Sequence, residues 1–210
     1  MKSLDFFLIS FVIAGTFCLT SKFYEYKVFE SNRSTNVEPI TIDESYILKK
    51  IKRENERKKS FAVSECKKNS DCKKIAEAIY FEARGETDIG KIAVAQLIIK
   101  RKNMKNFPNT IYGVIHQKNK YGVCHFSYVC DIEAGVIVKK FSEQKSYEKS
   151  LEFAYGVLHN KYKMYAKNAD HYYNPDKVES TPNWAKSMKK VAKIGNHLYL
   201  SSIKSDTIRL

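Results

Sequence analysis

Residues 75–86 constrain the fold more than any other part of the chain. Apolar residues recur there at helical spacing, so Ile75, Ala78 and Ile79 share one face of a predicted helix. Glu82 lies on that same face, where a core residue is expected. Burying a carboxylate costs several kcal/mol unless something compensates it. The position of Glu82 therefore calls for either a structural partner or a chemical role.

A catalytic role for Glu82 is consistent with its place in this helix. Gly85 follows three residues later, at a usual helix end, so Glu82 falls in the last turn. The negative end of the helix dipole and partial burial both raise the pKa of a carboxyl group, as a general acid near neutral pH requires. The alternative is a structural glutamate paired with Arg84, Arg101 or a lysine.

The chain is strongly basic, with a formal net charge of +14 over 210 residues. Such a charge attracts polyanions, either nucleic acid or the anionic polymers of a cell envelope. Much of the excess lies in residues 49–53 and 57–59, which could equally be a solvated helix face or stalk. No zinc-finger, recognition-helix or RNA-binding signature accompanies the charge, so we do not expect nucleic acid as a partner.

The amino-terminal residues predict export. Residues 6–19 are uncharged and mostly apolar, which suits a signal peptide and is short for a full membrane span of roughly 20 residues. We expect residues 1–21 to be a signal peptide or an uncleaved membrane anchor, and the protein to lie in the periplasm or cell envelope, secreted or tethered. A buried core helix is the alternative. Residues 22–65 are expected to form a polar, basic linker, with a charged helix at 46–59, and residues 66–205 the folded domain.

Four cysteines follow the apolar stretch, namely Cys66, Cys72, Cys124 and Cys130. In an exported protein an even set of cysteines predicts disulfides, and the two local pairs are the simplest of three connectivities. A structural zinc site is the alternative, but neither pair has the two-to-four-residue gap typical of zinc ligands. We therefore expect no metal and no cofactor.

The remaining periodicity predicts a mainly helical domain with short strands. A helix capped by Thr87 or Asp88 should follow the first one, and residues 143–160 should form another. Pro182 suits the start of a helix running to Val191, and residues 199–200 suggest a short strand.

Several short motifs follow one another along the chain: Tyr80-Phe81-Glu82-Ala83-Arg84-Gly85-Glu86, Ala93-Val94-Ala95-Gln96, Phe107-Pro108-Asn109-Thr110, Cys124-His125-Phe126-Ser127-Tyr128-Val129-Cys130-Asp131, His171-Tyr172, Pro182-Asn183-Trp184-Ala185 and Ile194-Gly195-Asn196-His197-Leu198-Tyr199. In this order they resemble the cell wall hydrolases of the SleB type, which are spore cortex-lytic enzymes with bacterial and phage relatives. The resemblance covers roughly residues 72–200. It implies a small, mainly α-helical (α+β), lysozyme-like catalytic domain that acts on the glycan strands of peptidoglycan.

The resemblance also implies roles for individual residues. It assigns the general acid to Glu82 and a supporting role to Glu86. Asp131, which follows the loop between Cys124 and Cys130, is a further possible supporting carboxylate, with a cap or turn residue as the alternative. Since only Glu82 has a strong case, we favour a lytic transglycosylase that cuts between N-acetylmuramic acid and N-acetylglucosamine. A hydrolytic muramidase using a second carboxylate such as Asp131 is the first alternative, and a non-catalytic peptidoglycan-binding envelope protein is the second.

Candidate sugar-binding residues offer flat apolar faces or polar tips. They are Tyr80, Gln96, Phe126, Ser127, Tyr128, His171, Tyr172, Trp184 and His197. Any of the aromatic residues could instead belong to the core, and His171 and His197 could be structural.

Overall fold

The computed structural model describes residues 43–138 and 140–202, and the expected export segment lies outside them. The helices of this part are α1 (Glu44–Lys68), α2 (Ser70–Ala83), α3 (Asp88–Lys102), α4 (Ile111–Ile115), α5 (Ser127–Glu133) and α6 (Gln144–Leu158). They are followed by the strands β1 (His171–Tyr173), β2 (Lys189–Ile194) and β3 (His197–Ser201), and by two 3₁₀ turns at Pro175–Lys177 and Asn183–Ala185. The prediction of a mainly helical domain with short strands is confirmed.

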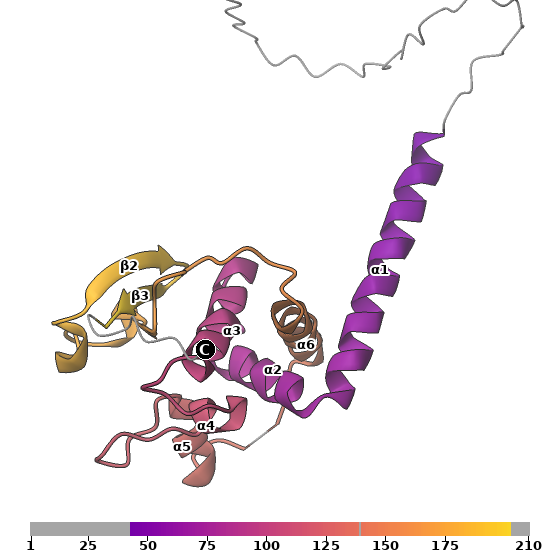
Figure 1. Cartoon of the computed structure of the whole chain (residues 1–210). Coiled ribbons are helices and arrows are strands. Elements are labelled where there is room, and N and C mark those ends of the chain that lie inside the picture. Colours follow the sequence, from indigo (N-terminus) through magenta and orange to yellow (C-terminus); the bar gives the residue numbers. More distant parts are fainter. Residues whose placement is uncertain (1–42, 139, 203–210) are drawn as a thin grey trace, which may run out of the picture. The chain divides into compact units, whose positions relative to one another are not determined.

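Helix α2 is the central element, because it packs against α1, α3, α4 and α6. Figure 1 shows it crossing the middle of the helical part. Ile75, Ala78 and Ile79 are completely buried along it, as their spacing predicts. Asn69 caps its first turn by accepting a hydrogen bond from the Cys72 amide at 2.8 Å. The buried part of α2 is therefore fixed in the core, and this fixes the position of the last turn, which carries Glu82.

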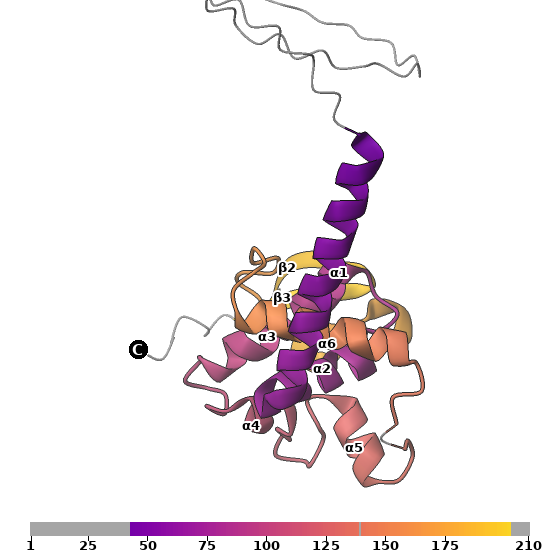
Figure 2. The same ribbon diagram turned by 90° about the vertical axis from the view of Figure 1, so that its right-hand side faces the viewer.

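Helix α1 begins inside the expected linker and runs through the expected boundary at residue 65. Asp43 caps it, and its first part confirms the charged helix predicted at 46–59. Of the residues of α1, only Ala62 and Cys66 are buried. The helix crosses α6 and contacts it (Figure 2). The disulfide between Cys66 and Cys72 joins the end of α1 to the start of α2.

The three strands form an antiparallel sheet in the order β1-β3-β2. It lies on the side of α3 away from α1 (Figure 1), and β2 contacts α3. Tyr199 and Leu200 of the central strand are buried, at 0% and 1% exposure. Tyr199 belongs to a small core with Ala93 and Leu97 of α3, so the sheet is packed against that helix.

The helix predicted from Pro182 to Val191 is wrong. A 3₁₀ turn at Asn183–Ala185 is followed by strand β2, which pairs with β3. The two strands are joined at Gly195 and Asn196, where Gly195 has a φ of 57°. A two-residue turn with positive φ forms a tight hairpin, so pairing with β3 overrides the helical start signal of Pro182.

Within the described residues, none of the helices combines the length and the apolar character that crossing a membrane requires.

Candidate active site

Glu82 lies in the last turn of α2 with its side chain partly exposed. Tyr172 of β1 donates a hydrogen bond from its hydroxyl to Glu82 Oε2 at 3.0 Å. Burial raises the pKa of Glu82 to about 7, although the Tyr172 hydrogen bond and the charges of Arg101 and Lys177 act in the opposite direction. The carboxyl group is thus both reachable and protonated in a large fraction of molecules near neutral pH.

Tyr172 is held in place by the sheet behind it. Its ring packs against His197 at 4.8 Å and Tyr199 at 5.6 Å between centroids, both on the neighbouring strand β3. Burial, followed by the charge of Glu82, raises the pKa of Tyr172 well above its usual value. The phenol therefore stays protonated and acts as the donor toward Glu82.

A fixed positive charge stands next to this pair. Arg101, at the end of α3, is buried with its guanidinium 5.0 Å from the ring centre of Phe107 and 5.6 Å from that of Phe126. Burial lowers the pKa of Arg101 to about 10, so the group remains charged at neutral pH. The structural pairing with Glu82 considered from the sequence is not the main contact, because Arg101 Nε donates to the Asp170 carbonyl at 2.7 Å.

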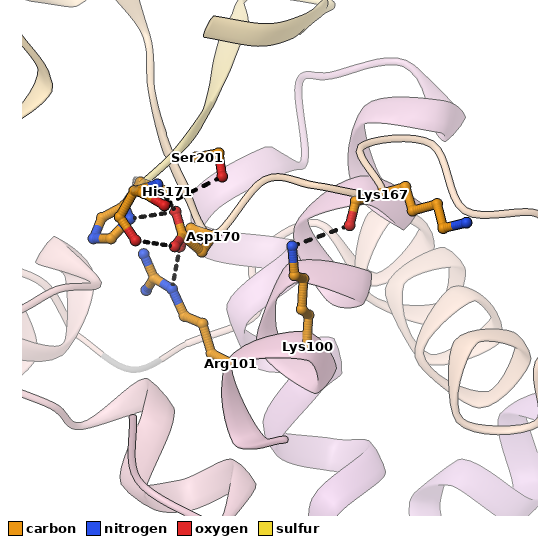
Figure 3. A network of polar contacts seen from close by, with 7 residues as sticks. Lys100, Arg101, Lys167, Asp170, His171 and Ser201 are labelled. Atoms are coloured by element: carbon orange, nitrogen blue, oxygen red, sulfur yellow. Dashed lines mark hydrogen bonds and ion pairs between the residues drawn. The ribbon is translucent and has the colours of Figure 1, made fainter. Parts of the chain in front are cut away.

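Asp170 anchors the segment that leads into β1 (Figure 3). Its buried carboxylate accepts hydrogen bonds from His171 Nδ1 at 2.8 Å, from the Ser202 amide at 2.9 Å and from Ser202 Oγ at 2.5 Å. These bonds outweigh burial and lower the pKa of Asp170. Sequence reasoning missed Asp170 and considered Arg101 only as a possible partner of Glu82. Arg101 lies four positions after the core residue Leu97, and this helical spacing was an available signal that Arg101 is buried.

Glu86 supports the hairpin rather than lining the site. Its two carboxylate oxygens accept hydrogen bonds from the amide and the side-chain Nδ2 of Asn196, each at 3.0 Å. A Cβ on Gly195 would clash with Glu86 Oε2, so the turn and the carboxylate fit closely together. The hairpin fixed in this way carries His197 and Tyr199, which pack behind Tyr172.

Asp131 lies in α5. The structure joins Cys124 to Cys130 by a disulfide, and Asp131 follows directly after it. The charge of Asp131 raises the pKa of Glu82, which places the two carboxylates within electrostatic reach of each other. Ser127, inside the same ring, is exposed at the start of α5.

Tyr80 and Gln96 are not placed to bind a ligand. Tyr80 is 2% exposed, and its hydroxyl accepts a hydrogen bond from the Glu143 amide at 3.1 Å. Gln96 is buried, with its Nε2 donating to the Lys163 carbonyl at 2.8 Å and its Oε1 accepting from the Tyr165 amide at 3.1 Å. Both side chains hold loops on the core, which corrects their assignment to substrate binding.

The other candidates divide by exposure. Phe126 is buried under Arg101, and Tyr128 is buried against Phe81, with ring centres 4.9 Å apart. His197 is also buried, whereas Trp184 is 44% exposed and its ring centre lies 5.6 Å from that of His171. Trp184, His171 and Ser127 thus have surface available to a ligand, as does the partly exposed Tyr172 described above.

Among the described residues, one group has its side chains close enough to hold a metal ion: Cys124, Cys130 and Glu133. The two cysteines are joined to each other by the disulfide, so their sulfur atoms are not available as thiolate ligands.

The chain was compared with known proteins. It is 31% identical over 131 residues to a spore cortex-lytic enzyme of Bacillus subtilis, covering 62% of this chain and 37% of that protein. It is 32% identical over 130 residues to a spore cortex-lytic enzyme of Bacillus cereus, covering 62% of this chain and 44% of that protein. The chain thus spans less than half the length of these curated relatives.

Two solved structures are also similar. One is the catalytic domain of the germination-specific lytic transglycosylase SleB from Bacillus anthracis, at 30% identity and a TM-score of 0.46, covering 62% of this chain and 93% of that one. The other is the catalytic domain of the Bacillus cereus SleB protein, at 32% identity and a TM-score of 0.47, covering 62% and 89%.

A family model described as cell wall hydrolase matches residues 85–200, which is more than half of the chain. The matched segment begins three residues after Glu82 and includes α3, α5 and all of the sheet except the last residue of β3. Since the match covers most of the folded domain and agrees with the order of the motifs, this chain belongs to the cell wall hydrolase family.

Proposed function

We propose that this protein cleaves the glycan strands of peptidoglycan as a lytic transglycosylase, cutting between N-acetylmuramic acid and N-acetylglucosamine. The observation that carries the proposal is Glu82, a partly exposed carboxyl group whose pKa is raised to about 7 and which Tyr172 holds in place. The family and the name of the relatives, spore cortex-lytic enzyme, support peptidoglycan as the substrate.

In the first step Glu82 acts as a general acid. Its carboxyl proton passes to the glycosidic oxygen, and the bond from that oxygen to C1 of the muramic acid breaks with its electron pair going to the oxygen. The departing N-acetylglucosamine leaves with a free hydroxyl group. The muramic acid carries an oxocarbenium-like charge, which the new Glu82 carboxylate stabilises.

In the second step the same group acts as a base. The Glu82 carboxylate takes the proton from the C6 hydroxyl of the muramic acid, and that oxygen bonds to C1 to close a 1,6-anhydro ring. The proton returns to Glu82, so no water and no second carboxylate are consumed. Tyr172 steadies the carboxylate between the two steps, while the charges of Arg101 and Lys177 stabilise its ionised form.

A hydrolytic muramidase is the second candidate, and one observation favours it. Asp131 is close enough for its charge to raise the pKa of Glu82, and it could activate a water molecule on the opposite side of the sugar. The two reactions differ in their products, because hydrolysis leaves a reducing end where transglycosylation leaves an anhydro end.

Export to the periplasm or cell envelope is part of the proposal, with residues 1–21 as signal peptide or membrane tether. Two features support it: the apolar residues 6–19 and the two disulfides, which persist in oxidising compartments.

The test is a digest of purified peptidoglycan by the full chain and by its Glu82→Gln variant, with the fragments weighed by mass spectrometry. Anhydro-muropeptides from the wild type and none from the variant are expected. Reducing-end products would replace transglycosylation by hydrolysis, and Asp131→Asn would then be the next variant. A folded wild type that releases no fragments would leave a non-catalytic glycan-binding protein.

A further inference from the structure

A hollow of about 620 Å³ lies beside the network of Arg101, Asp170 and His171, and its volume is within the range of small-ligand sites, roughly 300–1,000 Å³. Two serines line it together with Asn106, Phe107, Gln117, His125, His171 and Met188. Of these residues, only His171 was a candidate for ligand binding from the sequence. The mechanism proposed above does not use the hollow.

The hollow adjoins the candidate active site across β1 and Arg101. His171 and Tyr172 are neighbours in β1, and successive side chains of a strand point to opposite faces. Tyr172 binds Glu82, whereas His171 lines the hollow. The charge of Arg101 acts on both Glu82 and His125, so Arg101 is within electrostatic reach of both places.

The lining contains no carboxylate, lysine or arginine, although the chain carries a net charge of +14. Phe107 and Met188 supply apolar surface, while the other side chains supply amides, imidazoles and hydroxyls. Burial, followed by the neighbouring charge of Arg101, lowers the pKa of His125 to about 4, so its ring is neutral at pH 7. Such a lining matches a neutral ligand with one apolar face and several hydroxyl or acetamido groups.

Two of the polar groups have hydrogen-bonding capacity to spare. Gln117 Oε1 is buried and has no hydrogen-bond partner among the described residues. His171 uses Nδ1 for Asp170, which leaves Nε2 for another partner. A buried amide oxygen without a hydrogen-bond partner is energetically unfavourable. A ligand that donates a hydrogen bond to this oxygen would therefore bind more tightly.

We propose that this hollow is a subsite for one N-acetylhexosamine unit of a glycan strand, away from the bond that is cut. The assignment rests on the proposed function, because it takes the bound polymer to be the one that Glu82 cleaves. The stem peptides of peptidoglycan fit less well, since they carry carboxylates and the lining contains no lysine or arginine.

The test uses the full chain with Glu82→Gln, which prevents turnover, and free tri-N-acetylchitotriose as the probe. Saturable NMR shifts of the Gln117 side-chain amide and of His125 are expected on titration, with no shifts for maltotriose, which lacks acetamido groups. Gln117→Leu and His125→Ala should each weaken binding about three- to tenfold, the loss of one hydrogen bond. His159→Ala, at a histidine outside the lining that packs on Tyr155, is the matched control and should leave the affinity unchanged.

The outcomes separate this subsite from the cleavage reaction. The subsite would be overturned if neither substitution weakens the binding of tri-N-acetylchitotriose, in variants whose circular dichroism is unchanged. This holds even if the wild type cleaves peptidoglycan. Shifts at Gln117 and His125 with a wild type that releases no fragments would retain the subsite and remove the cleavage. NMR shifts with a free stem tripeptide and none with tri-N-acetylchitotriose would overturn the saccharide assignment.

Discussion

Protonation of one side chain, Glu82, sets the pH range in which the proposed first step can run. Its pKa is raised to about 7, chiefly by burial, and only the protonated form can donate to the glycosidic oxygen. Activity on peptidoglycan should therefore fall as the pH rises through about 7. An initial-rate profile from pH 5 to 9 measures this, and a rate that keeps rising to pH 9 would contradict it.

The same raised pKa makes a prediction for stability. A carboxyl group whose pKa is higher in the folded than in the unfolded protein stabilises the fold while protonated, below its ordinary value of about 4.5. That contribution is lost as the pH rises through about 7. Glu82→Gln, which is neutral throughout, should thus be about 1–3 kcal/mol more stable than the wild type at pH 8 and about equal at pH 4. Urea unfolding at the two pH values tests it, and equal stability at pH 8 would show an unperturbed Glu82.

Tyr172→Phe tests the hydrogen bond that Glu82 receives. That bond favours the ionised carboxylate, so its loss should raise the pKa of Glu82 further and move the alkaline fall in activity to higher pH. The rate should also drop, because the carboxylate formed in the first step loses a donor. Tyr173→Phe, at the next position of β1, is the control. A fall in rate with the same pH profile in Tyr172→Phe would mean that the hydroxyl does not act on Glu82.

At the residue scale, the periodicity that singled out Glu82 could not identify its neighbours. Spacing shows that Glu82 faces the core side of α2, but Tyr172 arrives from a strand 90 positions later. The prediction that Gln96 binds substrate is wrong because its partners also lie far away in the sequence. Gln96 shares a helix face with core residues, and its side-chain amide is hydrogen-bonded to the backbone of residues 163 and 165, which the spacing does not show.

Two disulfides of equal sequence separation, six residues each, allow a matched experiment at the scale of elements. Replacing either pair by alanine should cost about 2 kcal/mol of stability from the entropy of the unfolded chain alone. The ring closed by Cys124 and Cys130 carries Ser127 and precedes Asp131, whereas the other ring joins α1 to α2. Cys124→Ala with Cys130→Ala should therefore lower activity well below the melting temperature, while Cys66→Ala with Cys72→Ala should not.

The result is read from Tm and from the initial rate on peptidoglycan at 15 °C for both double variants. Equal activity in the two variants would show that the ring beside Asp131 does not position the site.

The sequence predicted helices in the regions of α2, α3 and α6 from their helical periodicity, and a charged helix within α1. Of these, α3 also had a recognisable start at Thr87 or Asp88. The same reasoning missed β2 because Lys189–Ile194 has no alternation of buried and exposed residues. Its strand form depends on pairing with β3 across a tight turn. The dipeptide Gly195-Asn196 between two segments was the available hairpin signal.

At the scale of the whole molecule, the net charge of +14 should make binding to peptidoglycan depend on salt. Most side chains of α1 are exposed, and it carries the basic residues 49–53 and 57–59. Changing Lys49, Lys50, Lys52 and Arg53 to glutamate should weaken sedimentation with intact peptidoglycan at 50 mM salt and have little effect at 500 mM. Cleavage of soluble glycan fragments should be unaffected, and equal sedimentation at low salt would assign the attraction elsewhere.

The contact between Glu86 and the hairpin has a consequence for how this chain can change during evolution. Glu86 and Asn196 are 110 positions apart, yet the carboxylate occupies the space that any side chain at Gly195 would need. A mutation at one of these positions leaves either a crowded turn or two unbonded donors. Alignments of related sequences should therefore show positions 86, 195 and 196 changing together, as one inherited unit assembled from two distant parts of the gene.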